Sequence, residues 1–98
     1  MSMDKIIREE ARLIVLRALD EQADGRLNSE LLRVTLEQFG ITKSRDWVHD
    51  ELNWLQEMGA VAVIVAGTVR VAALTNKGSD HVQRRVVIEG VKRPSREG

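Results

Sequence analysis

The stretch GAVAVIVAGTVRVAALTNKG, residues 59–78, decides the fold of this 98-residue chain. It places two runs of small and β-branched residues on either side of Gly67-Thr68. A Gly-x pair between two such runs is typical of a two-residue type II′ turn, in which the glycine takes a positive φ. The sequence therefore predicts a β-hairpin whose register sets Ala66 opposite Val69.

Alternation along both strands gives this hairpin two apolar faces. The first face holds Val61, Val63, Val65, Ala72 and Leu74, and the second holds Ala62, Ile64, Ala66, Val69, Val71 and Ala73. We expect the first face to turn towards the core, because Val61 follows a helix-ending glycine and Leu74 precedes the next helix. The second face then needs another cover.

The sequence predicts two helices before the helix that leads into the hairpin. Residues 4–22 contain neither glycine nor proline, and Ala23-Asp24-Gly25 breaks the pattern. A short extended stretch at Arg26-Leu27 follows. Asn28 is a suitable N-cap for a second helix, and Gly40 a suitable glycine beyond its end.

Two further helices flank the hairpin. Ser44 can cap a third helix that runs to Met58, with Gly59 as its stop. Three helices joined by such short turns contain a helix-turn-helix. Thr75 can cap a final helix that continues to about Ile88. The expected fold class is mainly α with a small β-hairpin (α+β): one domain over residues 1–88, with a flexible basic tail over residues 89–98.

Composition excludes several kinds of protein. The chain has no cysteine and only two histidines, so we expect neither a disulfide nor a metal site, and no cofactor. Nothing in it matches a phosphate-binding glycine loop, a nucleophile elbow or a pair of catalytic carboxylates, so we do not expect an enzyme. The longest apolar run is far shorter than the roughly 20 residues of a membrane span, and the first residues carry no apolar signal region, which favours a soluble, cytoplasmic protein.

The first helix carries a second apolar stripe that a lone small domain does not need. Together with the second hairpin face it implies a partner surface, and the simplest partner is another copy of the chain. The alternative is that the last helix folds back over part of this surface. The predicted homodimer interface consists of Ile7, Ala11, Ile14, Ala18, Ile64, Val69 and Val71.

The order of these elements resembles the winged helix-turn-helix domains of bacterial transcription regulators. Two motifs carry the resemblance: Leu55-x-x-Met58-Gly59-Ala60-Val61 at the end of the third helix, and Leu74-Thr75-x-x-Gly78 after the hairpin. Members of this family mostly bind duplex DNA, with the third helix in the major groove and the wing against the backbone. The resemblance covers roughly residues 5–88.

The resemblance implies two groups of DNA contacts. The third helix would supply Lys43, Arg45, His49, Asn53 and Gln56, whose side chains can bond base edges. The wing and tail would supply backbone contacts from Arg70, Arg84, Arg85, Lys92, Arg93 and Arg96. The alternative for the first group is a solvated helix face, and the alternative for the C-terminal cations is a solubilising tail.

The charge pattern argues against the DNA interpretation. The net charge is zero, and residues 1–83 hold ten basic against thirteen acidic residues. Residues 43–58 contain two cations and four carboxylates. The loop at the tip of the wing has only two residues and is shorter than the loop of a typical DNA-contacting wing. A basic face is what a nucleic-acid binder usually shows.

Two tryptophans and two histidines are left to assign. Trp47 and Trp54 are seven residues apart and so lie on nearly the same helix face, where such a pair is more often core than a ligand cage. We expect His49 and His81 at the surface.

A narrower resemblance is to small proteins of the late gene clusters of Mu-like phages and prophages. It is carried by Arg8-Glu9-Glu10-Ala11-Arg12-Leu13 and by Ile88-Glu89-Gly90-Val91-Lys92-Arg93-Pro94. Two functions follow as hypotheses. The chain is either a dimeric winged-helix protein that binds double-stranded DNA as a regulator, or a winged-helix module for protein–protein interaction, such as a phage accessory or assembly factor.

Overall fold

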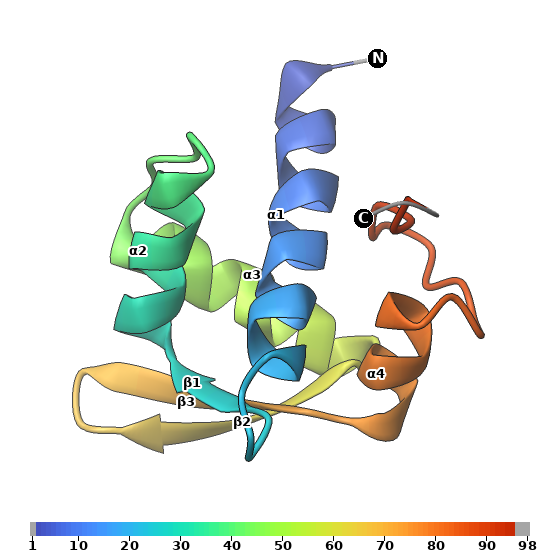
Figure 1. Cartoon of the computed structure of the whole chain (residues 1–98). Coiled ribbons are helices and arrows are strands. Elements are labelled where there is room, and N and C mark those ends of the chain that lie inside the picture. Colours follow the sequence, from blue (N-terminus) through green and yellow to red (C-terminus); the bar gives the residue numbers. More distant parts are fainter. Residues whose placement is uncertain (1, 96–98) are drawn as a thin grey trace.

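Seven elements follow one another along residues 2–95, the part of the chain that this computed structural model describes (Figure 1). They are α1 (Met3–Asp20), β1 (Arg26–Asn28), α2 (Ser29–Gln38), α3 (Arg45–Glu57), β2 (Val61–Ala66), β3 (Val69–Leu74) and α4 (Asn76–Val82). The strands form an antiparallel sheet in the order β1-β3-β2. Three helices over a small sheet that ends in a hairpin make a winged helix-turn-helix domain, as the sequence predicted.

The hairpin has the predicted turn and register. Ala66 pairs with Val69 and Val63 with Ala72. Gly67 takes a φ of +62°, whereas Thr68 is not among the residues with positive φ. A positive φ at the first turn position alone distinguishes type II′ from type I′, so the predicted turn type is confirmed.

Side-chain caps fix the helix starts where the sequence placed them. Asn28 Oδ1 accepts a hydrogen bond from the Leu31 N–H at 2.8 Å, and Ser44 Oγ accepts one from the Trp47 N–H at 3.1 Å. Gly40 and Gly59 follow α2 and α3 with φ of +84° and +79°. These local signals confirm the predicted boundaries of α2 and α3.

The two motifs that suggested the fold lie in direct contact. Thr75 donates its hydroxyl to the Gly59 carbonyl at 2.6 Å and its N–H to the Ala60 carbonyl at 3.1 Å. A Cβ on Gly78 would stand only 2.2 Å from the Ala60 oxygen. The glycine of the second motif therefore makes room for the backbone of the first.

The core is built around α1, which contacts all three other helices and the sheet. The predicted free stripe of α1 lies mostly inside it: Ala11 is fully buried, Ile14 and Ala18 are buried, and Ile7 is half-buried. The expectation that Ala11, Ile14 and Ala18 form an exposed surface is wrong. Neighbouring elements of the same chain cover them, above all α2 and α4, which both contact α1.

The hairpin's outer half departs from the predicted core face. Val61 and Ala72 are buried at its base, but Val65 is 69% exposed near the turn. Figure 1 shows the closed end of the hairpin extending past the helices, so alternation there no longer selects a core side. Ile64, on the second face, is 60% exposed, as expected.

The last helix is shorter than predicted. α4 ends at Val82 instead of continuing to about Ile88. Arg84 takes a left-handed φ of +67°, and the N–H groups of Arg85 and Val86 both reach back to the Asp80 carbonyl. The chain then turns so that Ile88 enters the core as part of a loop.

Residues 89–95 pack against α1 instead of forming the start of a flexible tail. Val91 is buried, the Lys92 N–H bonds the Glu9 carbonyl at 3.2 Å, and Lys92 Nζ lies 2.8 Å from a Glu10 carboxylate oxygen. Figure 1 shows this segment beside α1. The side chains of Ile88 and Val91 join the hydrophobic core at this place. Arg96 lies outside the described residues.

Candidate nucleic-acid interface

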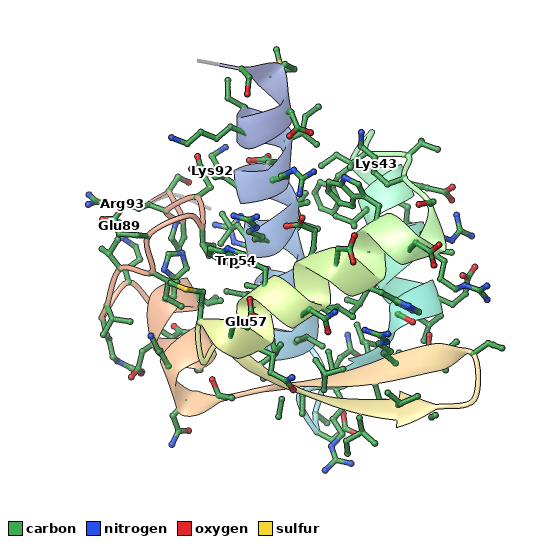
Figure 2. All side chains as sticks on the ribbon, turned by 180° about the vertical axis from the view of Figure 1, so that it is seen from behind. Lys43, Trp54, Glu57, Glu89, Lys92 and Arg93 are labelled. Carbon is green, nitrogen blue, oxygen red and sulfur yellow. The ribbon has the colours of Figure 1, made fainter. Side chains whose placement is uncertain are left out.

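Helix α3 has one buried side and two flanks. Val48, Leu52 and Leu55 form the buried side. One flank faces the hairpin, and the other faces α1 and the C-terminal segment, as Figure 2 shows from behind. The sequence-predicted contact residues divide between these flanks.

The hairpin flank is organised around Ser29, the first residue of α2. His49 Nε2 lies 3.0 Å from Ser29 Oγ, and that oxygen also accepts the Arg70 N–H at 3.0 Å. Arg70 then donates through Nη1 to Asn53 Oδ1 at 3.1 Å. The start of α2, the wing and α3 are thus tied together by side chains at their shared edge.

Gln56 extends this edge by one turn. Its Oε1 accepts the Val63 N–H at 2.7 Å, which caps a donor on the outer edge of β2. In both Asn53 and Gln56 the side-chain carbonyl oxygen accepts a hydrogen bond from another group of the protein. An amide whose oxygen is engaged keeps two N–H donors for another molecule.

We call Arg45, His49, Asn53, Gln56 and Arg70 the hairpin-side cluster. Burial, then the nearby positive charges of Arg70 and Arg45, lower the pKa of His49 below its usual 6.5. Arg45 lies four residues before His49 on α3 and therefore on the same side of the helix. The structure therefore gathers these five predicted contact residues on one side of α3.

Acidic residues occupy the solvent-facing centre of the same helix. Asp46, Asp50 and Glu57 are all exposed there, and Figure 2 labels Glu57 on α3. Carboxylates repel the phosphates that line a DNA groove. The donors of the hairpin-side cluster therefore stand at the edge of a negative strip.

The opposite flank carries the tryptophans. Trp47 and Trp54 are half-buried and pack against the core, in agreement with the core interpretation. Lys43 Nζ lies 5.4 Å from the centre of the Trp47 ring, so Lys43 belongs to this flank and not to the hairpin-side cluster. The Arg12 guanidinium stands 3.7 Å above the Trp54 ring.

A buried ion pair on this flank was not predicted from the sequence. Glu51 is 2% exposed and accepts from Arg12 Nε at 2.5 Å and from Arg8 Nη1 at 3.0 Å. Arg12 also donates to the Gly90 carbonyl at 2.9 Å. One signal could have revealed this site, because Glu51 lies in the apolar arc of α3 beside Leu52 and Leu55.

The basic residues after α4 do not join the hairpin-side cluster. Figure 2 shows Lys92 and Arg93 at the opposite end of the molecule from Lys43. Lys92 pairs with Glu10, and Arg85 Nη1 lies 3.2 Å from an Asp80 oxygen. A single basic surface formed by the third helix, wing and tail is therefore not present in residues 2–95.

Both histidines differ from the expected surface positions. His81 is fully buried and bonds the backbone at Ile88 and Lys92. His49 is partly buried against Ser29. Sequence alone gave no sign of these partners, because they come from distant segments.

The predicted dimer residues of the hairpin remain at the surface in part. Ile64 is exposed, while Val69 and Val71 are half-buried. The α1 residues instead line a groove of about 360 Å³ between α1, α2 and α4, where Ile14 and Ala18 meet the rim residues Phe39 and Val82. The two stripes thus lie on different parts of the molecule.

Among residues 2–95, no three histidine or acidic side chains stand close enough to hold a metal ion. None of the helices within these residues has the length and apolar character needed to cross a membrane.

The fold has counterparts among solved structures. A chain of the hsRosR-S4 complex superposes with a TM-score of 0.64 at 22% identity, over 80% of this chain and 72% of that chain. A chain of the hsRosR-S1 complex gives a TM-score of 0.59 at 22% identity, over 70% of this chain and 61% of that chain. Our chain thus spans less than two thirds of the latter, and the likeness concerns the fold.

Sequence relatives come from a phage and a bacterium. No protein-family model matches the chain. An uncharacterized protein of Haemophilus influenzae is 36% identical over 63 residues, which are 64% of this chain and 61% of that protein. The uncharacterized protein gp26 of Escherichia phage Mu is 34% identical over 92 residues, 94% of this chain and 95% of gp26. The chain therefore belongs to the family of phage Mu protein gp26.

Proposed function

We propose that this protein is a cytoplasmic winged-helix regulator that binds double-stranded DNA through the hairpin-side cluster. One observation carries the proposal: Asn53 and Gln56 each use the side-chain oxygen to accept a hydrogen bond from the hairpin and keep their N–H donors, and Asn53 does so in contact with the Arg70 guanidinium group. Such a set of donors matches phosphate oxygens and the acceptor edge of guanine.

Arg70 would supply the wing's backbone contact. Its N–H and one guanidinium nitrogen are held by Ser29 and Asn53, so the side chain is pre-oriented before DNA arrives. A pre-oriented contact costs less entropy on binding. This compensates in part for a wing whose turn carries no cation.

The exposed carboxylates of α3 limit the affinity that we expect for duplex DNA. Asp46 and Asp50 would lie close to the groove, so binding to random duplex DNA should be weak and strongly dependent on salt. A preferred sequence must then contribute base contacts from Arg45 and Asn53.

The experiment is a fluorescence-anisotropy titration of labelled duplex DNA over a series of salt concentrations. Each phosphate contact adds about 0.9 to the slope of log affinity against log salt. Arg70→Ala should lower that slope by about 0.9 for every sequence, and Arg45→Ala should weaken a selected site more than random DNA. Lys5→Ala is the charge-matched control, because Lys5 lies in the first turn of α1, far from the sheet (Figure 1). Absence of binding at low salt would contradict the proposal.

A homodimer belongs to the same proposal. Ile64 and its neighbours on the second face of the hairpin offer small aliphatic side chains to a second copy. Burial of apolar surface contributes roughly 25 cal/mol per Å², and a two-fold axis would place two α3 helices side by side on DNA.

Sedimentation over a concentration series tests the dimer. Ile64→Glu should shift the protein to monomer while leaving its melting temperature within a few degrees, because Ile64 is exposed. Ile14→Glu is the contrasting variant and should unfold the domain, because Ile14 is buried. A wild-type monomer at tens of micromolar, or a dimer that survives Ile64→Glu, would contradict the interface.

The second candidate function is a protein–protein interaction module. The exposed carboxylates Asp46, Asp50 and Glu57 favour it, because a negative helix face suits a basic protein partner. Asp46→Asn with Asp50→Asn separates the two functions. The double variant should strengthen DNA binding if DNA is the ligand, and should weaken capture of a basic partner if a protein is.

A further inference from the structure

A small pocket lies between the end of α4 and the C-terminal segment, away from the hairpin-side cluster. It has a volume of about 170 Å³ and is lined by His81, Arg84, Val86, Val87, Arg93 and Pro94. Figure 2 shows Arg93 at this side of the molecule. Nothing in the proposed DNA contact uses this pocket.

Two arginines line the pocket without a carboxylate partner among residues 2–95. Arg84 and Arg93 form no ion pair there, whereas the adjacent Arg85 pairs with Asp80 at 3.2 Å. Arg84 also holds a left-handed φ of +67°, which is uncommon for a residue with a Cβ and is often found at functional sites. Two uncompensated guanidinium groups at one pocket favour an anion.

His81 fixes the two walls relative to each other. Its Nδ1 accepts the Ile88 N–H at 3.1 Å, so its Nε2 carries the proton and donates to the Lys92 carbonyl at 2.9 Å. One wall is the loop that begins at Arg84, and the other contains Arg93. The buried imidazole therefore holds both arginine-bearing segments in place.

The size of the pocket limits its ligand. A water molecule takes about 30 Å³ of liquid, and pockets for whole cofactors or drug-sized ligands hold about 300–1,000 Å³. A space of about 170 Å³ suits one anionic group with a few attached atoms. Val86 and Val87 offer partly exposed apolar surface for those atoms.

We propose that this pocket binds the phosphate group of a small phosphate monoester. A phosphate monoester is close to a dianion at neutral pH and matches two guanidinium groups, each of which can bond its oxygens in pairs. Val86 and Val87 contact the carbon atoms next to the ester oxygen. The proposal is independent of the DNA function, because Arg84 and Arg93 lie outside the hairpin-side cluster.

The probe is phenyl phosphate, titrated into the full-length protein at constant ionic strength and followed by the backbone amide signals of the pocket in NMR. We expect saturable shifts at Val86 and Val87 with a Kd of about 1 mM, in keeping with a small, open site. Arg84→Gly and Arg93→Gln should each weaken binding about tenfold. Glycine is chosen at Arg84 because it accepts the left-handed backbone.

Arg85→Gln is the matched control, because it removes the same charge one residue away from Arg84 without touching the pocket. It should leave the Kd within about twofold, as should Arg45→Ala in the hairpin-side cluster. Thermal melts of Arg84→Gly and Arg93→Gln establish that each is folded, and either folded variant suffices.

Three results would overturn the proposal. The first is no saturable shift with phenyl phosphate beyond that of sodium chloride. The second is an equal loss in Arg85→Gln, which would mean unspecific attraction. The third is displacement of phenyl phosphate by duplex DNA, which would assign the two arginines to a DNA phosphate instead.

Discussion

The two flanks of α3 use polar side chains in opposite ways. On the tryptophan flank, the Glu51 carboxylate is enclosed by Arg8 and Arg12, and Arg12 is enclosed in turn by Trp54 and the Gly90 carbonyl. On the hairpin flank, Asn53 and Gln56 use only their oxygens and keep their donors at the surface. On the tryptophan flank the charged groups find their partners within the protein. On the hairpin flank the amide oxygens find partners within the protein, whereas the amide N–H donors stay available.

This difference separates structural polar groups from groups available to a partner. A buried charge with all its partners present ties segments together, here α1, α3 and the C-terminal segment. A neutral amide at the surface costs little to leave half-used. The same helix therefore fixes the fold with one flank and offers contacts with the other.

The largest expected effect is on the tryptophan flank. Glu51→Ala leaves the buried Arg12 guanidinium without its carboxylate, and breaking a buried pair in this way costs about 3–5 kcal/mol. The free energy of unfolding from urea denaturation measures the loss. The Lys92 N–H, which bonds the Glu9 carbonyl, should lose protection from hydrogen exchange in the same variant, because Arg12 links Glu51 to the C-terminal segment.

Glu57→Ala is the matched control, because Glu57 is an exposed carboxylate on the same helix. It should change stability by less than about 0.5 kcal/mol. The double variant Arg12→Met with Glu51→Leu should lose less than Glu51→Ala alone, since no charge is left unpaired. If Glu51→Ala and Glu57→Ala were equally mild, the two flanks would not differ as described.

A smaller effect is expected at the hairpin. Gly67 has a φ of +62° and open space around it, so Gly67→Val meets backbone strain and no clash. The cost should be about 1 kcal/mol or more, which lowers the melting temperature by roughly 4–8 °C in a domain of this size. Thr68→Val is the control, because Thr68 does not have a positive φ. An unchanged melting temperature for Gly67→Val would mean that the wing is loosely attached to the rest of the hairpin flank.

The smallest effect concerns His49. Burial and the charges of Arg70 and Arg45 hold its pKa below 6.5 in the folded protein. As pH falls below 6.5, the unfolded chain takes up the proton first, so the stability that His49 contributes is present above 6.5 and is lost as the pH drops towards the folded pKa. NMR titration of the His49 ring should give a midpoint below 6.5.

Arg70→Gln sharpens this test. It removes the second cause of the shift and should move the His49 midpoint upwards, whereas Lys5→Gln should not. The difference in stability between the wild type and His49→Gln should also shrink as pH falls below 6.5. A His49 midpoint at or above 6.5 would contradict the enclosed geometry at Ser29.

Local sequence signals predicted the elements well. Asn28, Ser44 and Thr75 cap the helices that they were expected to cap, and Gly67 makes the expected turn. Each of these effects depends on residues within a few positions of one another. The predicted end of the last helix was wrong. The N–H groups of Arg85 and Val86 turn back to the Asp80 carbonyl, and Ile88 packs into the core from the loop that follows.

The candidate site was predicted only in part. Arg45, His49, Asn53, Gln56 and Arg70 do lie together, whereas Lys43 joins the tryptophan flank and the cations after α4 lie elsewhere. Helical spacing brings His49, Asn53 and Gln56 to one side of α3. It does not tell which of their atoms are already bonded to the wing.

The sequence by itself determined the elements, their caps, the hairpin register and the order that makes a winged helix, because backbone preferences and turn geometry act between near neighbours. Only the tertiary structure decided which apolar stripe was covered, which cations were paired and where the chain beyond α4 lies. Those outcomes depend on contacts between residues far apart in sequence, such as Arg12 with Glu51 and His81 with Lys92. A pattern that shows an apolar or charged side chain does not show what the rest of the chain places against it.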